Sequence, residues 1–335
     1  MGTSRPQSGH AYYTVADASF FPGAVALLNS LRLGGERAPL FVVDCGLTDA
    51  QKNTLAKHAT VVPKQEGLHP VLQKATGPMA HPAELMILVD ADILITSSLA
   101  PLLERAADGQ VMGFEDSASP DRHFAEWSSL GLGVPATRPY VNCGMLIFSA
   151  STASEFLPLF VELQEQLDPA DTHFGGGAIS NPFYFADQDI LNGMLCTRFE
   201  GRVTRLEPRL APMPPFSGLA VVDGSPLGCA YGDGVVPYAL HHILEKPWLS
   251  KLRPSLYSEL FTTCVTHPEA PIRLGWRDVP LRLTNSWLAP LDRMRVELQL
   301  VAHQRLRGKL GIRPAIERRI QRGWRRSNAI TDRHP

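Results

Sequence analysis

Residues 85–92, LMILVDAD, decide how we interpret the fold of this 335-residue chain. An unbroken apolar run of this length is typical of a strand that is buried on both faces, as in a parallel sheet. The run ends in Asp90 and Asp92, and if strand geometry continued, both carboxylates would point to the same side. Such oxygen ligands suit Mg²⁺ or Mn²⁺. The alternative is an Asx turn before a helix with no metal, and the segment alone does not decide between the two.

Strands alternate with helices on both sides of this segment. Further strands are predicted at residues 11–16, 39–45, 60–62, 110–114 and 140–149, and helices at 24–33, 48–57, 99–106, 155–167 and 187–195. This alternation predicts an α/β fold with a Rossmann-like, largely parallel central sheet and flanking helices. The stretches 115–139 and 168–185 are predicted to be long loops, which in compact domains are usually functional.

Composition and charge exclude several classes of protein. The net charge of −1 gives no general attraction to nucleic acid, so we predict no nucleic-acid partner. No apolar run reaches about 18 residues, so neither a signal peptide nor a membrane span is expected. The five cysteines are scattered and contain no C-x-x-C pair, which predicts free thiols and a cytoplasmic location.

Two nucleotide-binding motifs are missing, and one competing family fits poorly. The first predicted strand carries no G-x-G-x-x-G, and the chain has no G-x-x-x-x-G-K-[ST], so neither a dinucleotide-binding domain nor a P-loop is supported. Paired aspartates also follow a strand in haloacid dehalogenase-like phosphatases. In that motif the fifth residue is Thr or Val, whereas Leu94 stands here, and the strand follows several strand–helix units. The phosphatase interpretation is therefore disfavoured.

Five segments, in this order, resemble the glycosyltransferase family 8 group, which are retaining enzymes with a GT-A fold. The segments are TVADASFFPGAVALLNSLR from residue 14, LVDADILI from 88, YVNCGMLIF from 140, ADQDILN from 186 and HHILEKPW from 241. Each segment is weak alone, but their order and spacing together are specific. The resemblance implies a GT-A-type catalytic domain over residues 1–250. A helical, basic C-terminal extension, residues 251–335, lies outside it.

The resemblance implies a metal site. Asp90 and Asp92 would hold Mn²⁺ or Mg²⁺ against the diphosphate of a UDP-sugar, and a histidine before Lys-Pro-Trp would be the third ligand. His241 and His242 are both candidates, and we favour His241 because it ends a predicted strand. The family pattern has six positions from His to Lys and includes a Gly. This chain lacks the Gly and has a shorter spacing to Lys246, which leaves the choice of histidine open.

The resemblance also implies which residues hold the donor. Thr14, Asp17 and Phe20 match the turn that cradles the base and ribose, where the family often has Tyr in place of Phe20. Stacking survives that change, whereas a hydroxyl contact does not. Lys74 and Lys246 would contact the diphosphate as point charges. For Lys74, a solvated helix lysine is an equally good interpretation.

Three further residues match the family's catalytic positions. Asp187 would fix sugar hydroxyls, Gln188 would lie near the anomeric carbon, and Asn142 would reach the donor sugar or the acceptor. An amide is a poor nucleophile, so a front-face path is favoured over a covalent intermediate. In any interpretation, the amide of Asn142 inside an apolar strand needs a hydrogen-bond partner. Asp189 is equally well explained as a helix N-terminal residue favoured by the dipole.

The function implied is metal-dependent, retaining transfer of a hexose, glucose or galactose, from a UDP-sugar to a glycan, lipid-linked or other acceptor. The alternative is a catalytically idle nucleotide-sugar- or glycan-binding protein of the same fold, which the altered His–Lys spacing favours. Residues 288–326 are rich in arginine with interspersed apolar residues. This pattern predicts peripheral contact with an anionic membrane, a solvated helix pair packed on the catalytic domain, or a surface that binds a partner.

Overall fold

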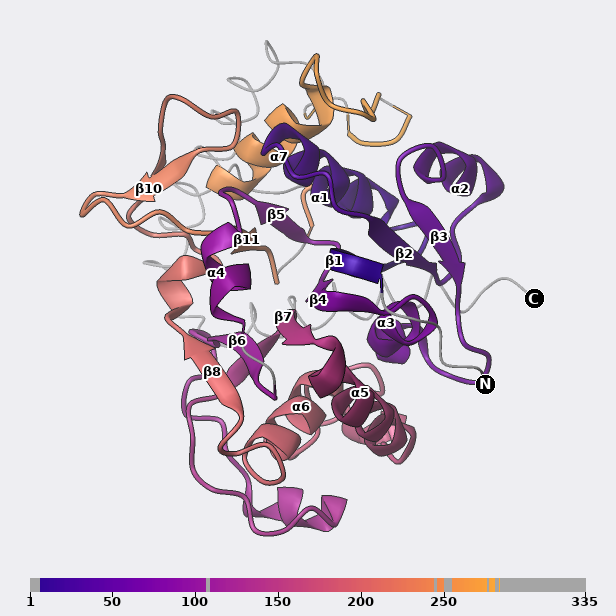
Figure 1. The fold of residues 1–335 in the computed structure, drawn as a ribbon, viewed down its shortest axis with the longest axis vertical. Helices are drawn as coiled ribbons and strands as arrows, with labels where there is room; N and C mark the ends of the chain where they lie inside the picture. Colours follow the sequence, from indigo (N-terminus) through magenta and orange to yellow (C-terminus); the bar gives the residue numbers. More distant parts are fainter. Residues whose placement is uncertain are drawn as a thin grey trace, which may run out of the picture.

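The computed structural model describes residues 7–106, 109–243, 246–249, 255–275, 277–280 and 283 (Figure 1). A seven-stranded sheet with the order β3-β2-β1-β4-β7-β6-β8 forms its centre. Its strands are β1 (Gln7–Ala16), β2 (Leu40–Asp44), β3 (Thr60–Pro63), β4 (Ala83–Val89), β6 (Val111–Glu115), β7 (Val141–Ser149) and β8 (Val203–Leu206). Every neighbouring pair is parallel except the two that contain β7. The predicted mostly parallel α/β sheet is therefore confirmed.

The apolar segment that precedes Asp90 is β4, in the middle of the sheet. Ile87 and Val89 belong to the core on one face, and Met86 and Leu88 belong to the core on the other. This alternation is the strand period of two, and burial on both faces explains why the run is apolar throughout.

The reversed strand β7 brings its first residues to the edge where β4 ends. Leu85 pairs with Ser149 and Val89 with Met145, so the chain before Met145 extends past the end of β4. Asp90 N donates to Gly144 O at 2.8 Å beyond the last ladder pair. An antiparallel strand thus contributes its start to the same edge at which the parallel strands finish.

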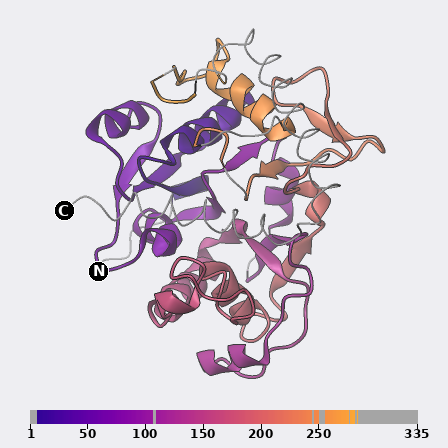
Figure 2. The same cartoon turned by 180° about the vertical axis from the view of Figure 1, so that it is seen from behind.

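Helices cover both faces of the sheet (Figure 1, and from behind Figure 2). α1 (Phe21–Leu33) packs with α7 (Leu256–Thr266) over one face, and α5 (Ala150–Glu165) with α6 (Asp187–Leu195) over the other. The shorter helices are α2 (Asp49–Leu55), α3 (Thr76–Ala80) and α4 (Ala100–Arg105), with 3₁₀ turns at Pro70–Ala75, Ala125–Leu130, Pro169–Asp171 and Pro208–Leu210.

Two small antiparallel pairs lie outside the main sheet. β9 (Leu219–Val221) pairs with β10 (Cys229–Tyr231), and β5 (Ile93–Ile95) pairs with β11 (Ala239–His241). The strand β5, which follows Asp92 directly, is not predicted from the sequence, because it is short and its partner lies far along the chain. The β5–β11 pair carries a distant histidine to the end of β4.

The chain beyond residue 250 enters the main core where the structure describes it. Tyr257, Leu260 and Phe261 of α7 are buried in the same cluster as α1. The domain boundary near 250 stays a prediction. The arginine-rich stretch 288–326, on which the membrane prediction rests, lies outside the described residues. Within the described part of the chain, no helix is both long and apolar enough to cross a membrane.

Candidate active site

The three residues predicted as metal ligands lie together where β4 ends. One ligand atom from each of Asp90, Asp92 and His241 lies within 4.8 Å of the others. His241 Nε2 is 3.4 Å from Asp92 Oδ1 and 3.9 Å from Asp90 Oδ2. Strand geometry does not continue from Asp90 to Asp92, because β4 ends at Val89. The chain turns at Asp90, whose carbonyl accepts from Ile93 N at 3.1 Å, and this turn brings the two carboxylates together.

Backbone pairing separates the two candidate histidines. His241 lies opposite Ile93 in the β5–β11 pair. Neighbouring strand residues point to opposite sides, so the His242 ring goes the other way and lies 4.7 Å from the Tyr257 ring. Gly144 makes room for His241, because a Cβ at that position would lie 2.7 Å from its Nδ1. The structure thus brings His241, and not His242, to the two aspartates.

Lys74 links one metal-site carboxylate to a residue of the predicted sugar site. Its Nζ lies 2.8 Å from Asp90 Oδ1 and 2.9 Å from Asp187 Oδ2. Burial alone would lower the pKa of Lys74, but Asp187 and Asp90 outweigh burial and raise the pKa well above its usual value. The side chain is 16% exposed, so Lys74 is a buried, charged group and not a solvated helix lysine.

Lys246 holds the second carboxylate. Its ammonium contacts Asp92 Oδ2 and the carbonyl oxygen of His242. Burial would raise the pKa of Asp92, yet Lys246 and His241 outweigh it, and the pKa lies well below its usual value. By contrast, burial raises the pKa of Asp90, and Lys74 opposes this only in part. Asp92 is therefore the firmly ionised member of the pair.

These residues fit a divalent cation. At about 2.1 Å from an octahedral ion, neighbouring ligand atoms lie about 3 Å apart and opposite ones about 4 Å apart. The separations of 3.4 and 3.9 Å at His241 fall in this range. Asp92 Oδ1 is buried and makes no well-formed hydrogen bond to the described residues, because its contact with His241 Nε2 is long, at 3.4 Å. A buried carboxylate oxygen that is so weakly paired is costly unless a cation compensates it. The two carboxylates suit Mn²⁺ or Mg²⁺, and the imidazole is a ligand that transition-metal ions such as Mn²⁺ accept more readily than Mg²⁺ does.

A second cluster joins the predicted catalytic residues through Asp116, which we did not predict. Asp116 follows β6 and is 4% exposed. Its Oδ2 accepts from Asn142 Nδ2 at 2.9 Å and from Gln188 Nε2 at 3.0 Å. Gln188 Oε1 in turn accepts from Cys143 N at 3.0 Å. Asp116 is thus the partner that the Asn142 amide required. A carboxylate directly after an apolar strand, as at Asp90, was the sequence signal for it.

Asp187 joins the two clusters. It is the first residue of α6, and its carboxylate contacts the same lysine as Asp90. Gln188 follows it and reaches Asp116 on the neighbouring strand end. The predicted metal and sugar residues therefore form one connected group of polar side chains at a single edge of the sheet.

The predicted nucleotide residues lie at the end of β1 and in the turn that follows. Thr14 Oγ1 is buried and has no hydrogen-bond partner among the described residues. Asp17 Oδ1 accepts from Phe20 N at 2.9 Å, which orders the turn into α1. The Phe20 ring lies 5.9 Å from Lys246 Nζ and 6.1 Å, edge-on, from the Trp248 ring. Trp248 is 5% exposed and packs in the same core cluster as α1 and α7.

Comparison with known proteins supports the fold. No family model matches the sequence, and no curated protein matches it. The structure resembles that of the galactosyltransferase LgtC in complex with donor and acceptor sugar analogs, with a TM-score of 0.53 at 18% identity. That match covers 80% of this chain and 99% of LgtC.

Two other solved glycosyltransferases share the architecture. WbbM, a bifunctional glycosyltransferase, has a TM-score of 0.54 at 15% identity over 80% of this chain, which spans 52% of WbbM. GlyE of Streptococcus pneumoniae TIGR4 has a TM-score of 0.50 at 14% identity over 85% of this chain and 64% of GlyE. The fold is therefore a Rossmann-like glycosyltransferase fold. Function has to be argued from the site itself.

Proposed function

We propose that this chain is a metal-dependent, retaining hexosyltransferase that uses a UDP-sugar donor, with glucose or galactose as the transferred sugar. The observation that carries the proposal is the meeting of Asp90, Asp92 and His241 with the ammonium groups of Lys74 and Lys246 at one sheet edge. Ligands of open α/β sheets bind at the carboxyl ends of the strands. A divalent cation together with two lysines suits the charge of a diphosphate.

The chain's own residues would divide the donor between them. Asp90, Asp92 and His241 would hold Mn²⁺ or Mg²⁺, which would neutralise charge on the leaving diphosphate. Lys74 and Lys246 would exchange part of their carboxylate contacts for phosphate oxygens. The Thr14 hydroxyl, together with Asp17 and Phe20, would face the ribose and base, which would give the buried Thr14 Oγ1 a partner.

The sugar would lie over Asp187, Gln188 and Asn142. Asp187 would accept hydrogen bonds from sugar hydroxyls. Both amide atoms of Gln188 are already engaged, one by Cys143 N and one by Asp116, so its side chain is held in place and is a weak nucleophile. We therefore propose a front-face path in which the departing phosphate helps to deprotonate the acceptor hydroxyl.

The acceptor would enter beside the long loops at residues 115–139 and 168–185. LgtC was crystallised with donor and acceptor sugar analogs, which supports a carbohydrate acceptor, either a glycan or a lipid-linked sugar. The cytoplasmic location predicted from the scattered cysteines is part of this proposal.

A second candidate is a nucleotide-sugar-binding protein without turnover. Its support is the spacing between His241 and Lys246, which is shorter than the family pattern, and the closed hydrogen bonding of Gln188.

The two candidates differ in turnover. UDP release is measured from a panel of UDP-sugars with several acceptor glycans, with and without Mn²⁺, for the wild type and Asp92→Asn. The proposal expects Mn²⁺-dependent release from UDP-glucose or UDP-galactose that Asp92→Asn abolishes. Tight UDP binding without turnover over the whole panel supports the second candidate. Absence of any UDP binding contradicts both.

A further inference from the structure

The turn that precedes Asp187 is strained. Ala186 has φ 48° in a buried position, and its ψ of −113° takes it outside the left-handed helical region. Residues with a Cβ rarely adopt positive φ, and such a conformation persists only where its surroundings enforce it. Ile190 N donates to Ala186 O at 3.1 Å, and Ala186 is the N-cap residue of α6. Its backbone angles therefore set the direction of Asp187 and Gln188.

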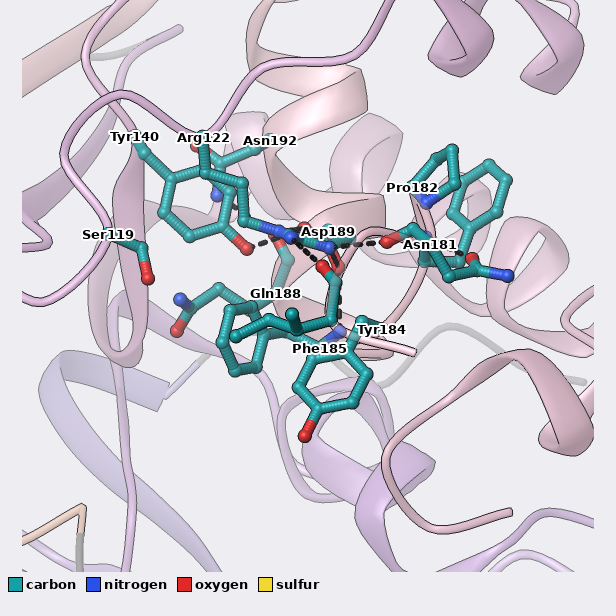
Figure 3. Close-up of polar contacts among 12 residues, drawn as sticks. Ser119, Arg122, Tyr140, Asn181, Pro182, Tyr184, Phe185, Gln188, Asp189 and Asn192 are labelled. Atoms are coloured by element: carbon teal, nitrogen blue, oxygen red, sulfur yellow. Dashed lines mark hydrogen bonds and ion pairs between the residues drawn. The ribbon is translucent and has the colours of Figure 1, made fainter. Parts of the chain in front are cut away.

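A buried carboxylate forms hydrogen bonds that hold this turn. Asp189, in the first turn of α6, is 0% exposed. It accepts two bonds from Arg122, Nε to Oδ1 at 2.6 Å and Nη2 to Oδ2 at 2.7 Å (Figure 3). It also accepts from Tyr140 OH and from Phe185 N, both at 2.7 Å. The bond to Phe185 N reaches back across Ala186, so the carboxylate holds the chain on both sides of the strained residue.

Arg122 also binds the loop that precedes α6, around residues 179–181. Its Nη1 donates to Ile179 O at 2.9 Å, and its Nη2 donates to Asn181 O at 2.7 Å. The guanidinium lies over two rings, 4.6 Å from the centroid of Phe124 and 4.8 Å from that of Phe185. One side chain, 7% exposed, thus ties the loop after β6 to the loop before α6 and to α6 itself (Figure 3).

We propose that Arg122 and Asp189 form a clasp that holds the strained turn at Ala186 and thereby positions Asp187 and Gln188 for sugar transfer, an inference that rests on the proposed function. Both are positioning residues, because they act through the turn. A buried ion pair adds little stability over apolar residues of similar size. Its planar, bidentate geometry instead fixes direction, which is what a turn in a rarely populated conformation requires.

The test compares the kcat of UDP-sugar turnover with the affinity for UDP and Mn²⁺. In Arg122→Gln we expect kcat to fall about 100-fold, since a shift of about 1 Å in a reacting group has this effect. We expect the Kd for UDP with Mn²⁺ to change by less than about threefold, because Arg122 hydrogen-bonds to Asp189, Ile179 and Asn181 and to none of the residues that would hold the metal or the diphosphate. Arg198→Gln is the matched control. Arg198 follows α6 and lies outside both long loops, its pair with Glu155 is solvent-exposed, and we expect kcat within about twofold of the wild type.

A rescue variant separates positioning from folding. Glycine adopts positive φ without steric cost, so the turn no longer needs the clasp once Ala186 is replaced. We expect Arg122→Gln combined with Ala186→Gly to regain about tenfold in kcat over Arg122→Gln alone. A merely structural clasp predicts no such recovery. Thermal melting of each variant shows whether any loss reflects unfolding.

The outcomes are distinct. A selective loss of kcat with recovery in the double variant supports the clasp. A parallel rise of the UDP Kd in a folded Arg122→Gln, a wild-type kcat in that variant, or no recovery with glycine overturns it. If the wild type binds UDP but turns over no UDP-sugar, the proposed function fails and this inference fails with it. If the wild type turns over and only the clasp variants disagree, the clasp alone is wrong.

Discussion

The two halves of the candidate site are held together in opposite ways. Around Asp90, Asp92 and His241, like charges converge and two lysines balance them, and Asp92 Oδ1 has a long contact of 3.4 Å with His241 Nε2 but no well-formed hydrogen bond to the described residues. Around Gln188, the amide groups and the Asp116 carboxylate satisfy one another. The charges of the first half are balanced fully only when a cation and an anionic ligand bind, whereas the polar groups of the second half already satisfy one another. Binding of a metal and UDP should therefore depend chiefly on residues of the first half.

The largest expected effect comes from removing charge in the first half. Asp92→Asn takes away the ionised carboxylate and leaves Lys246 without its charged partner, although its contact with His242 O remains. We expect the initial rate of Mn²⁺-dependent UDP release to fall about 1,000-fold, the upper range for losing one electrostatic stabiliser in an active site. Asp121→Asn, at an exposed aspartate, is the control. A variant that keeps a tenth of the wild-type rate contradicts the comparison.

A smaller effect is expected in the second half. Both carboxylate oxygens of Asp116 accept hydrogen bonds, and Asp116→Asn replaces one of them with an NH₂ group, which cannot accept. This NH₂ group would face either the amide donors of Asn142 and Gln188 or the backbone N–H groups of Ala118 and Ser119. We expect kcat to fall about 100-fold through misplacement of Gln188, with UDP–Mn²⁺ affinity retained. Equal losses of affinity and kcat in the folded variant mean that the halves are not separate.

Gly144 lies between the halves and should affect both modestly. A Cβ there would lie 2.7 Å from His241 Nδ1 and 2.8 Å from Asn142 Oδ1. Overpacking of this kind costs about 1–3 kcal/mol of unfolding free energy, and displacing a ligand's support weakens metal binding about tenfold. Urea denaturation and Mn²⁺ titration of Gly144→Ala measure the two effects. At Gly201 a Cβ meets nothing within 4 Å, so Gly201→Ala should change neither.

The smallest effect is expected from Glu36, a charged group just beyond the C-terminal end of α1. Burial would raise the pKa of Glu36, but hydrogen bonds from Ala38 N and His10 outweigh it and lower the pKa below 4.5. Its stabilisation is therefore present above the unfolded pKa and is lost as pH falls through the folded one. We expect Glu36→Gln to cost about 1 kcal/mol at pH 7 and less in acid, with kcat unchanged. Urea denaturation at the two pH values decides this, and a pH-independent cost contradicts it.

Local patterns predicted most elements, and their failures have physical causes. The helix at residues 187–195 was predicted within its observed bounds, because its polar start and apolar run are both local. β5 was missed since three residues carry little pattern, and its partner β11 lies far along the chain. α5 begins at Ala150, earlier than predicted, because Ser149 caps it with its side chain. The reversed direction of β7 follows from non-local pairing, which no local period encodes.

The candidate site shows the same difference between residues that lie in local motifs and residues whose partners are distant in the sequence. The predicted metal and donor residues stand in short motifs, and the structure brings Asp90, Asp92 and His241 together. Asp116 and Arg122 were missed because their partners lie 26 and 67 positions away, and no spacing rule links such distant residues. The charged residues that meet at the edge of the sheet could thus be predicted from motifs, whereas the groups that hold their neighbours in place could not.

Isothermal titration of UDP, with and without Mn²⁺, tests the central claim most directly. If Asp90, Asp92 and His241 complete their half of the site with a cation, Mn²⁺ should tighten UDP binding at least about tenfold in the wild type, a coupling that must be reciprocal. The same titration of Asp92→Asn should show no such gain. UDP binding of equal strength with and without Mn²⁺ in both proteins would contradict the account.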